Sequence, residues 1–303
     1  MKNLAGLFGL LMVASPMAWG KTIPSGNAFV STDFSYTSAR DLWKGNGQEA
    51  IFSDNNADTR VRGKTTSYNY GLSASFGIPF GMQLDFRTQY TTTRMNNATH
   101  PNAANGAMGA SVRGISEASL ILKKHVYANS WLDQDFYIGY RHPGETTPQS
   151  PTFIAITDFS NHYILGSETG FHFSKQWSFV NDIRYIMRSE ADKLATMELP
   201  SDQMEWSGRL SWQYDSKLTL SSSAIWRHTF SGPDISTADF VTAVGLAGHP
   251  PFYAARERFL GYAMGGNYRV GSRSYLGVSR FKKVWGRNTD RSRTWSVFYG
   301  YYF

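Results

Sequence analysis

The chain has 303 residues, a formal net charge of +7, a mean hydropathy of −0.37 and no cysteine. The absence of cysteine excludes a disulfide framework and a lipid anchor on cysteine. The basic residues are scattered rather than gathered in one run, so we expect no nucleic-acid partner. Aromatic residues make up 15% of the chain, which is more than a soluble domain needs and suits the aromatic girdles of a membrane protein.

Residues 1–20 have the pattern of a secretory signal peptide. Lys2 supplies a basic start, residues 4–13 form an apolar run, and small residues up to Gly20 resemble a cleavage site. The apolar run is too short to cross a membrane as a helix. We therefore predict cleavage after Gly20 and a single domain in residues 21–303, which contain no apolar stretch long enough for a transmembrane helix.

After residue 27, large apolar and polar residues alternate with the period of two that marks β-strands. In residues 66–77, for example, Tyr70 and Leu72 flank Gly71, and small or polar residues fill every second position. The alternation predicts twelve strands, at residues 28–37, 66–77, 82–93, 115–126, 131–141, 161–173, 177–188, 204–214, 218–228, 257–270, 274–285 and 291–303.

The facing of one strand and the total count stay open. In residues 274–285, Arg280 and Lys282 share the parity of apolar residues, so the pattern does not decide which side points outward. The connections at 38–65 and 229–256 are long enough to hold further strands. Counts from ten to fourteen strands are therefore compatible with the sequence.

Short and long connections alternate along the chain. Turns such as 78–81 and 215–217 are short, whereas connections such as 94–114 are long. None of the eleven prolines lies inside a predicted strand, as expected for a residue that cannot donate to a β-ladder. We therefore predict an all-β fold: an antiparallel up-and-down transmembrane β-barrel of the bacterial outer membrane, with both termini on the periplasmic side.

The last predicted strand ends with alternating aromatic residues at Tyr299, Tyr301 and Phe303. Bacterial outer-membrane barrels end in this way, so we interpret these three residues as an assembly signal for the barrel-assembly machinery. Outer-membrane lipid and lipopolysaccharide are the further partners implied by this location, because a basic exterior can meet lipopolysaccharide phosphates.

The polar faces of the predicted strands supply the residues of the barrel interior. Twelve strands enclose more space than an eight-stranded barrel and less than a sixteen-stranded porin. The inward charges have both signs, so they either pair and stabilise the wall or set a field that selects solutes. The candidates for lining the lumen and setting selectivity are Asp85, Arg87, Glu117, Glu168, Asp182, Arg184, Glu205, Arg209 and Arg227.

A barrel enzyme of the phospholipase or protease type is the competing class, and a structural or adhesive barrel is a third. A phospholipase needs a Ser nucleophile and a His base, and Ser160 and His162 are the nearest such residues, with Asn161 on the opposite face. Asp133 and Asp135 share a face but have no evident His partner, so we predict no metal site. We predict no cofactor and no catalytic residue.

Three strings resemble a known group of barrels. Residues 114–124 are similar to the glycine, acid and alternating-strand signature of the outer-membrane transporters associated with meta-pathway phenol degradation. Residues 140–146 and 286–289 resemble strand ends of the same group. This group is similar to the long-chain fatty acid transporter type of channel. The resemblance implies passive uptake of small molecules, including small aromatic or apolar compounds, and transfers no binding residue.

Overall fold

The structure, a computed structural model, describes residues 22–43, 49–51, 64–96, 111–144, 160–189, 202–230 and 256–303. These residues form twelve long strands and one strand of three residues, β2. The strands are β1 (Ala28–Trp43), β2 (Glu49–Ile51), β3 (Lys64–Ile78), β4 (Met82–Asn96), β5 (Ser111–Ala128), β6 (Leu132–Pro143), β7 (His162–His172), β8 (Trp177–Arg188), β9 (Gln203–Gln213), β10 (Leu218–Thr229), β11 (Arg258–Arg269), β12 (Ser274–Arg287) and β13 (Thr289–Tyr302).

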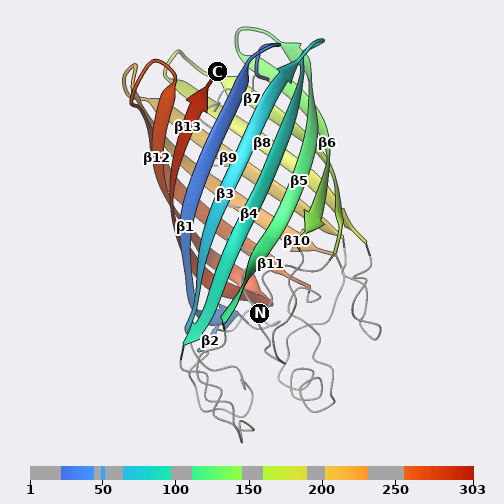
Figure 1. Cartoon of the computed structure of the whole chain (residues 1–303), viewed down its shortest axis with the longest axis vertical. Helices are drawn as coiled ribbons and strands as arrows, with labels where there is room; N and C mark the ends of the chain where they lie inside the picture. The colour runs from blue at the N-terminus through green and yellow to red at the C-terminus, as the bar shows by residue number, and fades with distance from the viewer. Residues whose placement is uncertain are drawn as a thin grey trace, which may run out of the picture.

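The long strands close into a single antiparallel barrel (Figure 1). Each long strand pairs with its neighbours in sequence, with β2 as a short side branch on β1, and β13 returns to pair with β1. Closure joins the first and last of the twelve long strands, which is required in a membrane because lipid cannot satisfy the backbone groups of an open edge. The predicted fold, a transmembrane up-and-down barrel, is therefore confirmed. Within the described ranges, no helix is long and apolar enough to cross a membrane.

The predicted strands are present, and most extend further than the alternation indicated. β8 has the predicted bounds, whereas β1 continues to Trp43 and β5 begins at Ser111. The segment Glu49–Ile51 was expected within a long connection and instead pairs with the end of β1. The remaining long connections and the predicted signal peptide, residues 1–20, lie outside the described residues.

In three short turns at one end of the barrel, a side-chain oxygen accepts a hydrogen bond from a backbone N–H across the turn. Asn129 Oδ1 accepts from the backbone N–H of Leu132 at 2.7 Å, and Ser174 Oγ accepts from that of Trp177 at 3.1 Å. Asp215 Oδ1 accepts from the N–H of Leu218 at 2.7 Å, and such bonds lower the pKa of the Asp215 carboxyl. Asn, Ser and Asp at the first turn position favour this geometry, so the sequence itself specifies tight hairpins here.

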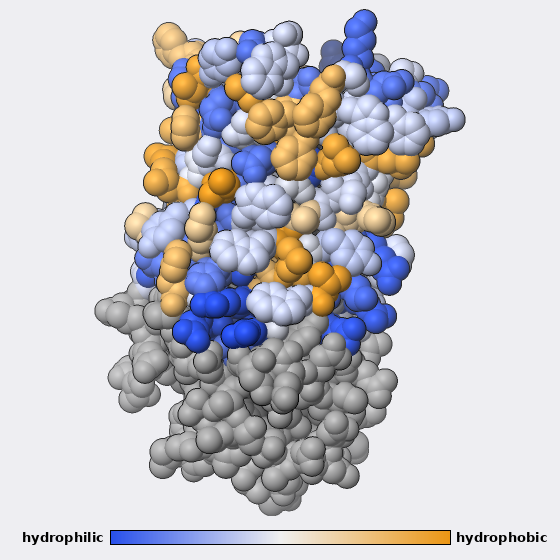
Figure 2. All heavy atoms as spheres, turned by 180° about the vertical axis from the view of Figure 1, so that it is seen from behind, coloured by the Kyte–Doolittle hydropathy of each residue, from blue (hydrophilic) through white to orange (hydrophobic). Residues whose placement is uncertain are grey.

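The outer wall is apolar, as the alternation predicts. Tyr70 of β3 and Leu165 of β7 are each 54% exposed, although neither lies at an end of its strand. Figure 2 shows a mixture of orange and pale aromatic residues over much of the described wall, with blue residues gathered beside the grey part. In water this surface would be unstable, whereas in a bilayer it faces hydrocarbon and aromatic side chains lie at the interfaces.

Inward-pointing aromatic rings lie over glycines of neighbouring strands. A Cβ atom placed on Gly166 of β7 would come within 2.2 Å of the Tyr137 ring of β6. Phe281 lies over Gly261 in the same way. The wall therefore accommodates rings on its inner face by omitting a side chain on the adjacent strand.

We expect Gly166→Ala to destabilise the barrel by about 1–3 kcal/mol, the usual cost of overpacking, because Tyr137 would have to move. The measurement is urea unfolding of the refolded protein in lipid vesicles. Gly271→Ala is the matched control, since its Cβ would meet only Ser274 Oγ at 3.9 Å. Equal stability of the two variants would contradict the assigned packing.

Candidate functional site: the inner wall

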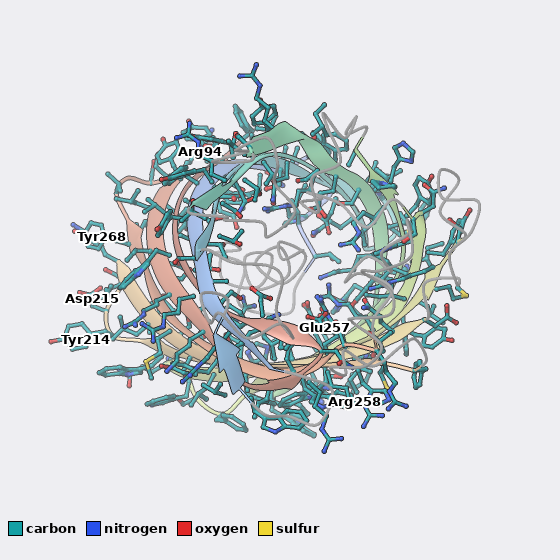
Figure 3. All side chains as sticks on the ribbon, turned by 90° about the horizontal axis from the view of Figure 1, so that it is seen from below. Arg94, Tyr214, Asp215, Glu257, Arg258 and Tyr268 are labelled. Atoms are coloured by element: carbon teal, nitrogen blue, oxygen red, sulfur yellow. The ribbon has the colours of Figure 1, made fainter. Side chains whose placement is uncertain are left out.

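The inner wall of the barrel carries the charged residues that the sequence predicted. Figure 3 shows Glu257 pointing into the barrel and its neighbour Arg258 pointing away from it, as alternation requires. Arg87, Glu117, Asp182, Glu205 and Arg227 are buried in the structure, although each belongs to a strand that faces lipid on its other side. Their burial results from contacts among inward-facing side chains.

The first chain of ion pairs begins on β1 and passes to β6. Arg87 Nη1 of β4 lies 3.1 Å from Asp33 Oδ1, and Arg87 Nε lies 3.5 Å from Glu117 Oε1 of β5. Glu117 Oε2 then lies 3.5 Å from Arg141 Nη1 of β6, and Arg141 contacts the ring of His162 on β7. Opposite charges thus alternate around part of the wall.

A glycine allows this chain to cross β3. Gly71 of β3 is paired with Asp33 of β1 and with Gln89 of β4. A Cβ atom on Gly71 would come within 2.3 Å of Asp33 Oδ1. The missing side chain therefore lets the Asp33 carboxylate lie over β3 and reach Arg87, two strands away.

The second chain runs from β8 to β13. Arg184 contacts Asp182 on its own strand and lies 3.7 Å, Nε to Oε1, from Glu205 of β9. Glu205 Oε2 lies 2.8 Å from Arg227 Nη2 of β10, and Arg227 Nη1 lies 3.1 Å from Glu257 Oε2. Lys283 Nζ of β12 then lies 3.1 Å from Glu257 Oε1 and 3.0 Å from Asp290 Oδ1 of β13. The predicted arginines therefore alternate with carboxylates and do not form a separate basic strip.

The three other predicted lumen residues also lie on the inner face. Lys123 Nζ donates to Glu168 Oε1 at 3.3 Å, and Asp85 Oδ1 accepts from Gln83 Nε2 at 2.7 Å. Arg209 is half-buried on β9, where Glu168 and Asp182 are the carboxylates that act on it electrostatically. Asp85 lies only two positions from Arg87 in the sequence, but Arg87 pairs with Asp33 and Glu117.

Each of the two aspartates that had no evident His partner has one in the structure. His125 Nδ1 lies 2.6 Å from Asp135 Oδ1, and His172 Nε2 contacts Asp133 Oδ2. These contacts join neighbouring strands, which sequence spacing does not reveal. The two pairs stay separate, and no group of three or more metal-ligating side chains occurs in the described part of the chain.

Ser160 and His162 meet on the inner wall. Ser160 Oγ lies 3.0 Å from His162 Nε2, while the other ring nitrogen of His162 faces the Arg141 guanidinium. A serine nucleophile requires a His base whose second nitrogen is oriented by a carboxylate or amide. Here a cation occupies that side, and both Ser160 and His162 are buried. Among the described residues, the pair therefore lacks the arrangement of a hydrolase site.

The sequence pattern did not predict the apolar side chains on the inner wall. Ile225, Phe259 and Phe281 form one buried cluster with Ala263, and Tyr137 forms another with two isoleucines, Ile164 and Ile186. Arg227 Cζ lies 5.0 Å, and Lys283 Nζ 4.4 Å, from the centre of the Phe259 ring, within the range of cation–π attraction. The alternation could have revealed Phe281, because it lies two positions from Lys283 and side chains two positions apart on a strand point to the same side.

Glu257 precedes β11 at the end of the barrel that carries the long connections. Burial raises the pKa of this carboxyl, but Lys283 and Arg227 beside it outweigh burial and lower the pKa from 4.5 to about 2. A carboxyl whose folded pKa is depressed stabilises the fold above its ordinary pKa and loses that contribution as pH falls toward the folded value.

We therefore expect the free energy of unfolding to decrease between about pH 5 and pH 2. Part of this decrease should disappear in Glu257→Gln, which cannot be protonated. Denaturant unfolding at several pH values, in detergent that keeps the same charge throughout, measures the slope. An unchanged slope in the variant would show that Glu257 does not contribute.

Comparisons with known proteins support the fold. No protein-family profile matches the chain, and no curated protein matches its sequence. Its structure is similar to that of an outer membrane channel from Pseudomonas putida F1, with a TM-score of 0.64 and 11% identity over 93% of this chain and 97% of that one. It is also similar to the NanC porin, with a TM-score of 0.53 and 8% identity over 90% and 98%. At such identities the likeness shows a shared barrel fold alone.

Proposed function

We propose that the chain is a bacterial outer-membrane channel for the passive uptake of small molecules. The observation that carries this proposal is the closed wall, apolar outside and lined inside by charged and hydrogen-bonding side chains. Lipid-facing apolar residues that alternate with polar interior residues are the pattern of barrels that enclose an aqueous path. The two similar structures are a channel and a porin, which agrees with this function.

The paired interior charges favour small uncharged solutes. Most interior arginines face carboxylates at 2.8–3.7 Å, so their fields largely cancel at the distance of a passing solute. The sequence resemblance to transporters of phenol degradation supports the same class, namely small aromatic or apolar compounds.

Planar bilayer recording tests the channel. The purified full chain should insert to give discrete conductance steps, whereas heat-unfolded protein should give none. Phospholipid and peptide turnover should be absent. Turnover that is abolished by His162→Ala, together with no conductance, would replace the channel with an enzyme. A protein that shows neither conductance nor turnover would be assigned to the structural or adhesive class of barrel.

Uptake measurements test the solute class separately. Cells that lack the protein should take up a small uncharged aromatic such as phenol more slowly than cells that express it, at low external concentration. Uptake of a charged analogue such as benzoate should change less. A larger effect on benzoate would assign the channel to anions and leave the conductance result unaffected.

Ion selectivity should be weak in the native protein because the interior charges alternate in sign. Arg209→Ala should shift the reversal potential toward cations, because it removes an inward positive charge that Glu168 and Asp182 face. Lys175→Ala, in an exposed turn, is a control with the same charge change. An equal shift in both variants would remove Arg209 from the residues that determine selectivity.

A further inference from the structure

Cations gather on the outer face of β11–β13. The structure resolves the facing of β12: Phe281 and Lys283 are buried inward, so Arg280 and Lys282 point out with the apolar residues of that strand. The outer face of the same three strands also carries Arg258, Arg287 and Arg293. We refer to Arg258, Arg280, Lys282, Arg287 and Arg293 together as the outer cationic surface.

Within this surface, like charges lie directly opposite each other on neighbouring strands. Lys282 of β12 pairs in register with Arg293 of β13. Arg258 of β11 pairs in register with Arg287 of β12. Like charges placed directly opposite each other across a sheet destabilise it, so the sequence maintains two unfavourable contacts, which residues 283–286 separate along β12.

In the part of the chain that the structure describes, no carboxylate pairs with these cations. The acids nearest in sequence, Glu257 and Asp290, both pair with Lys283 on the inner wall. Within the described ranges, no ion pair joins a carboxylate to Lys282, Arg293 or Arg287. Arg280 has an aromatic partner instead, since its Cζ lies 5.0 Å from the centre of the Trp295 ring.

The outer cationic surface lies toward the end of the barrel that holds the long connections. Lys282 is opposite Tyr262 of β11, and Trp295 is opposite Tyr36 of β1. A band of outward aromatic residues marks the interface between hydrocarbon and head groups. Cations beside and beyond that band lie at head-group depth, whereas Arg or Lys nearer the bilayer centre would cost about 2–4 kcal/mol.

We infer that the outer cationic surface binds the phosphate groups of lipopolysaccharide in the outer leaflet. Lys282 with Arg293, and Arg258 with Arg287, form two separate pairs of donors, each of which suits one phosphate group. Phosphate oxygens between paired cations convert each repulsive contact into charge-assisted hydrogen bonds. The inference depends on the outer-membrane location and not on whether the barrel conducts.

Native mass spectrometry of the detergent-solubilised full chain tests this inference with diphosphoryl lipid A as the probe. The wild type should retain lipid A, and Lys282→Gln combined with Arg293→Gln should bind it at least about tenfold more weakly, since two contacts to a charged group are lost. Lipid A without phosphates should bind neither protein. Lys175→Gln combined with Lys217→Gln, which removes two exposed cations from turns at the other end, should bind like the wild type.

Thermal unfolding provides a readout that separates binding from folding. In detergent alone, the Lys282→Gln, Arg293→Gln variant should be at least as stable as the wild type, because a like-charge contact has been removed. Added lipid A should raise the unfolding temperature of the wild type more than that of the variant. Equal lipid A affinity in both proteins, or equally tight binding of phosphatidylglycerol, would overturn the assignment to lipopolysaccharide.

Discussion

Replacement of Arg227 by Ala is expected to destabilise the folded barrel by about 3–5 kcal/mol, the cost of leaving a buried ion pair broken. Arg227 is fully buried. Its Nε and Nη2 atoms donate to Glu205 Oε2 at 2.9 and 2.8 Å, and Nη1 donates to Glu257 Oε2 at 3.1 Å. Truncation therefore leaves two carboxylates without their shared cation and removes the guanidinium from the Phe259 ring.

Urea unfolding in lipid vesicles, followed by tryptophan fluorescence, measures this loss. Arg227→Ala combined with Glu205→Gln should lose less than the sum of the single variants, because removing both members relieves the unpaired charge. Arg273→Ala, in an exposed turn, should stay within about 0.5 kcal/mol of the wild type. A loss below about 1 kcal/mol for Arg227→Ala would mean that water replaces the guanidinium at no great cost.

The strands and their facing could be predicted because a β-strand in a barrel wall has two different environments. Lipid on one side and polar groups on the other impose the period of two directly on the sequence. This holds in β3, where Tyr70 faces out and Asn69 is buried inside. Parity alone does not decide the facing of β12, because Arg280 and Lys282 face out with apolar residues. The burial of Phe281 and Lys283 inside the barrel decides it.

The partners inside the barrel could not be predicted, because they depend on register and side-chain reach. Arg87 pairs with Asp33, which is 54 positions away, and not with Asp85, two positions away. The contact requires Gly71 on the intervening strand, a condition that alternation alone does not express. The inward rings of Phe259 and Phe281 were missed for a related reason: apolar residues were assigned to the lipid face throughout, although cation–π contacts and facing glycines hold rings inside.

Deletion of Phe303 is expected to reduce the amount of folded barrel in the outer membrane severalfold. The final strand closes the barrel: Tyr301 pairs with Val30, Tyr299 pairs with Thr32, and the backbone N–H of Phe303 donates to the carbonyl of Ala28 at 2.8 Å. The Phe303 ring packs edge-on against Tyr301, with 4.9 Å between ring centres. Deletion removes the last closing hydrogen bond, worth about 1 kcal/mol, and the terminal ring that we expect the assembly machinery to recognise.

Phe173 separates the contribution of the lipid-facing ring from that of the terminal position. Its exposed fraction, 67%, is close to the 62% of Phe303. Phe173→Ala removes a comparable lipid-facing ring at the end of β7, next to a short turn, but leaves the terminal strand intact. If recognition of the terminus dominates, deletion of Phe303 lowers the level of heat-modifiable barrel in cells far more than Phe173→Ala does. Both proteins should then refold in detergent with similar stability. Phe303→Tyr should preserve the level of barrel in either case, because it keeps an aromatic ring at the terminus. Equal cellular losses for the deletion of Phe303 and for Phe173→Ala would show that burial of a ring in lipid, rather than the terminal position, determines assembly.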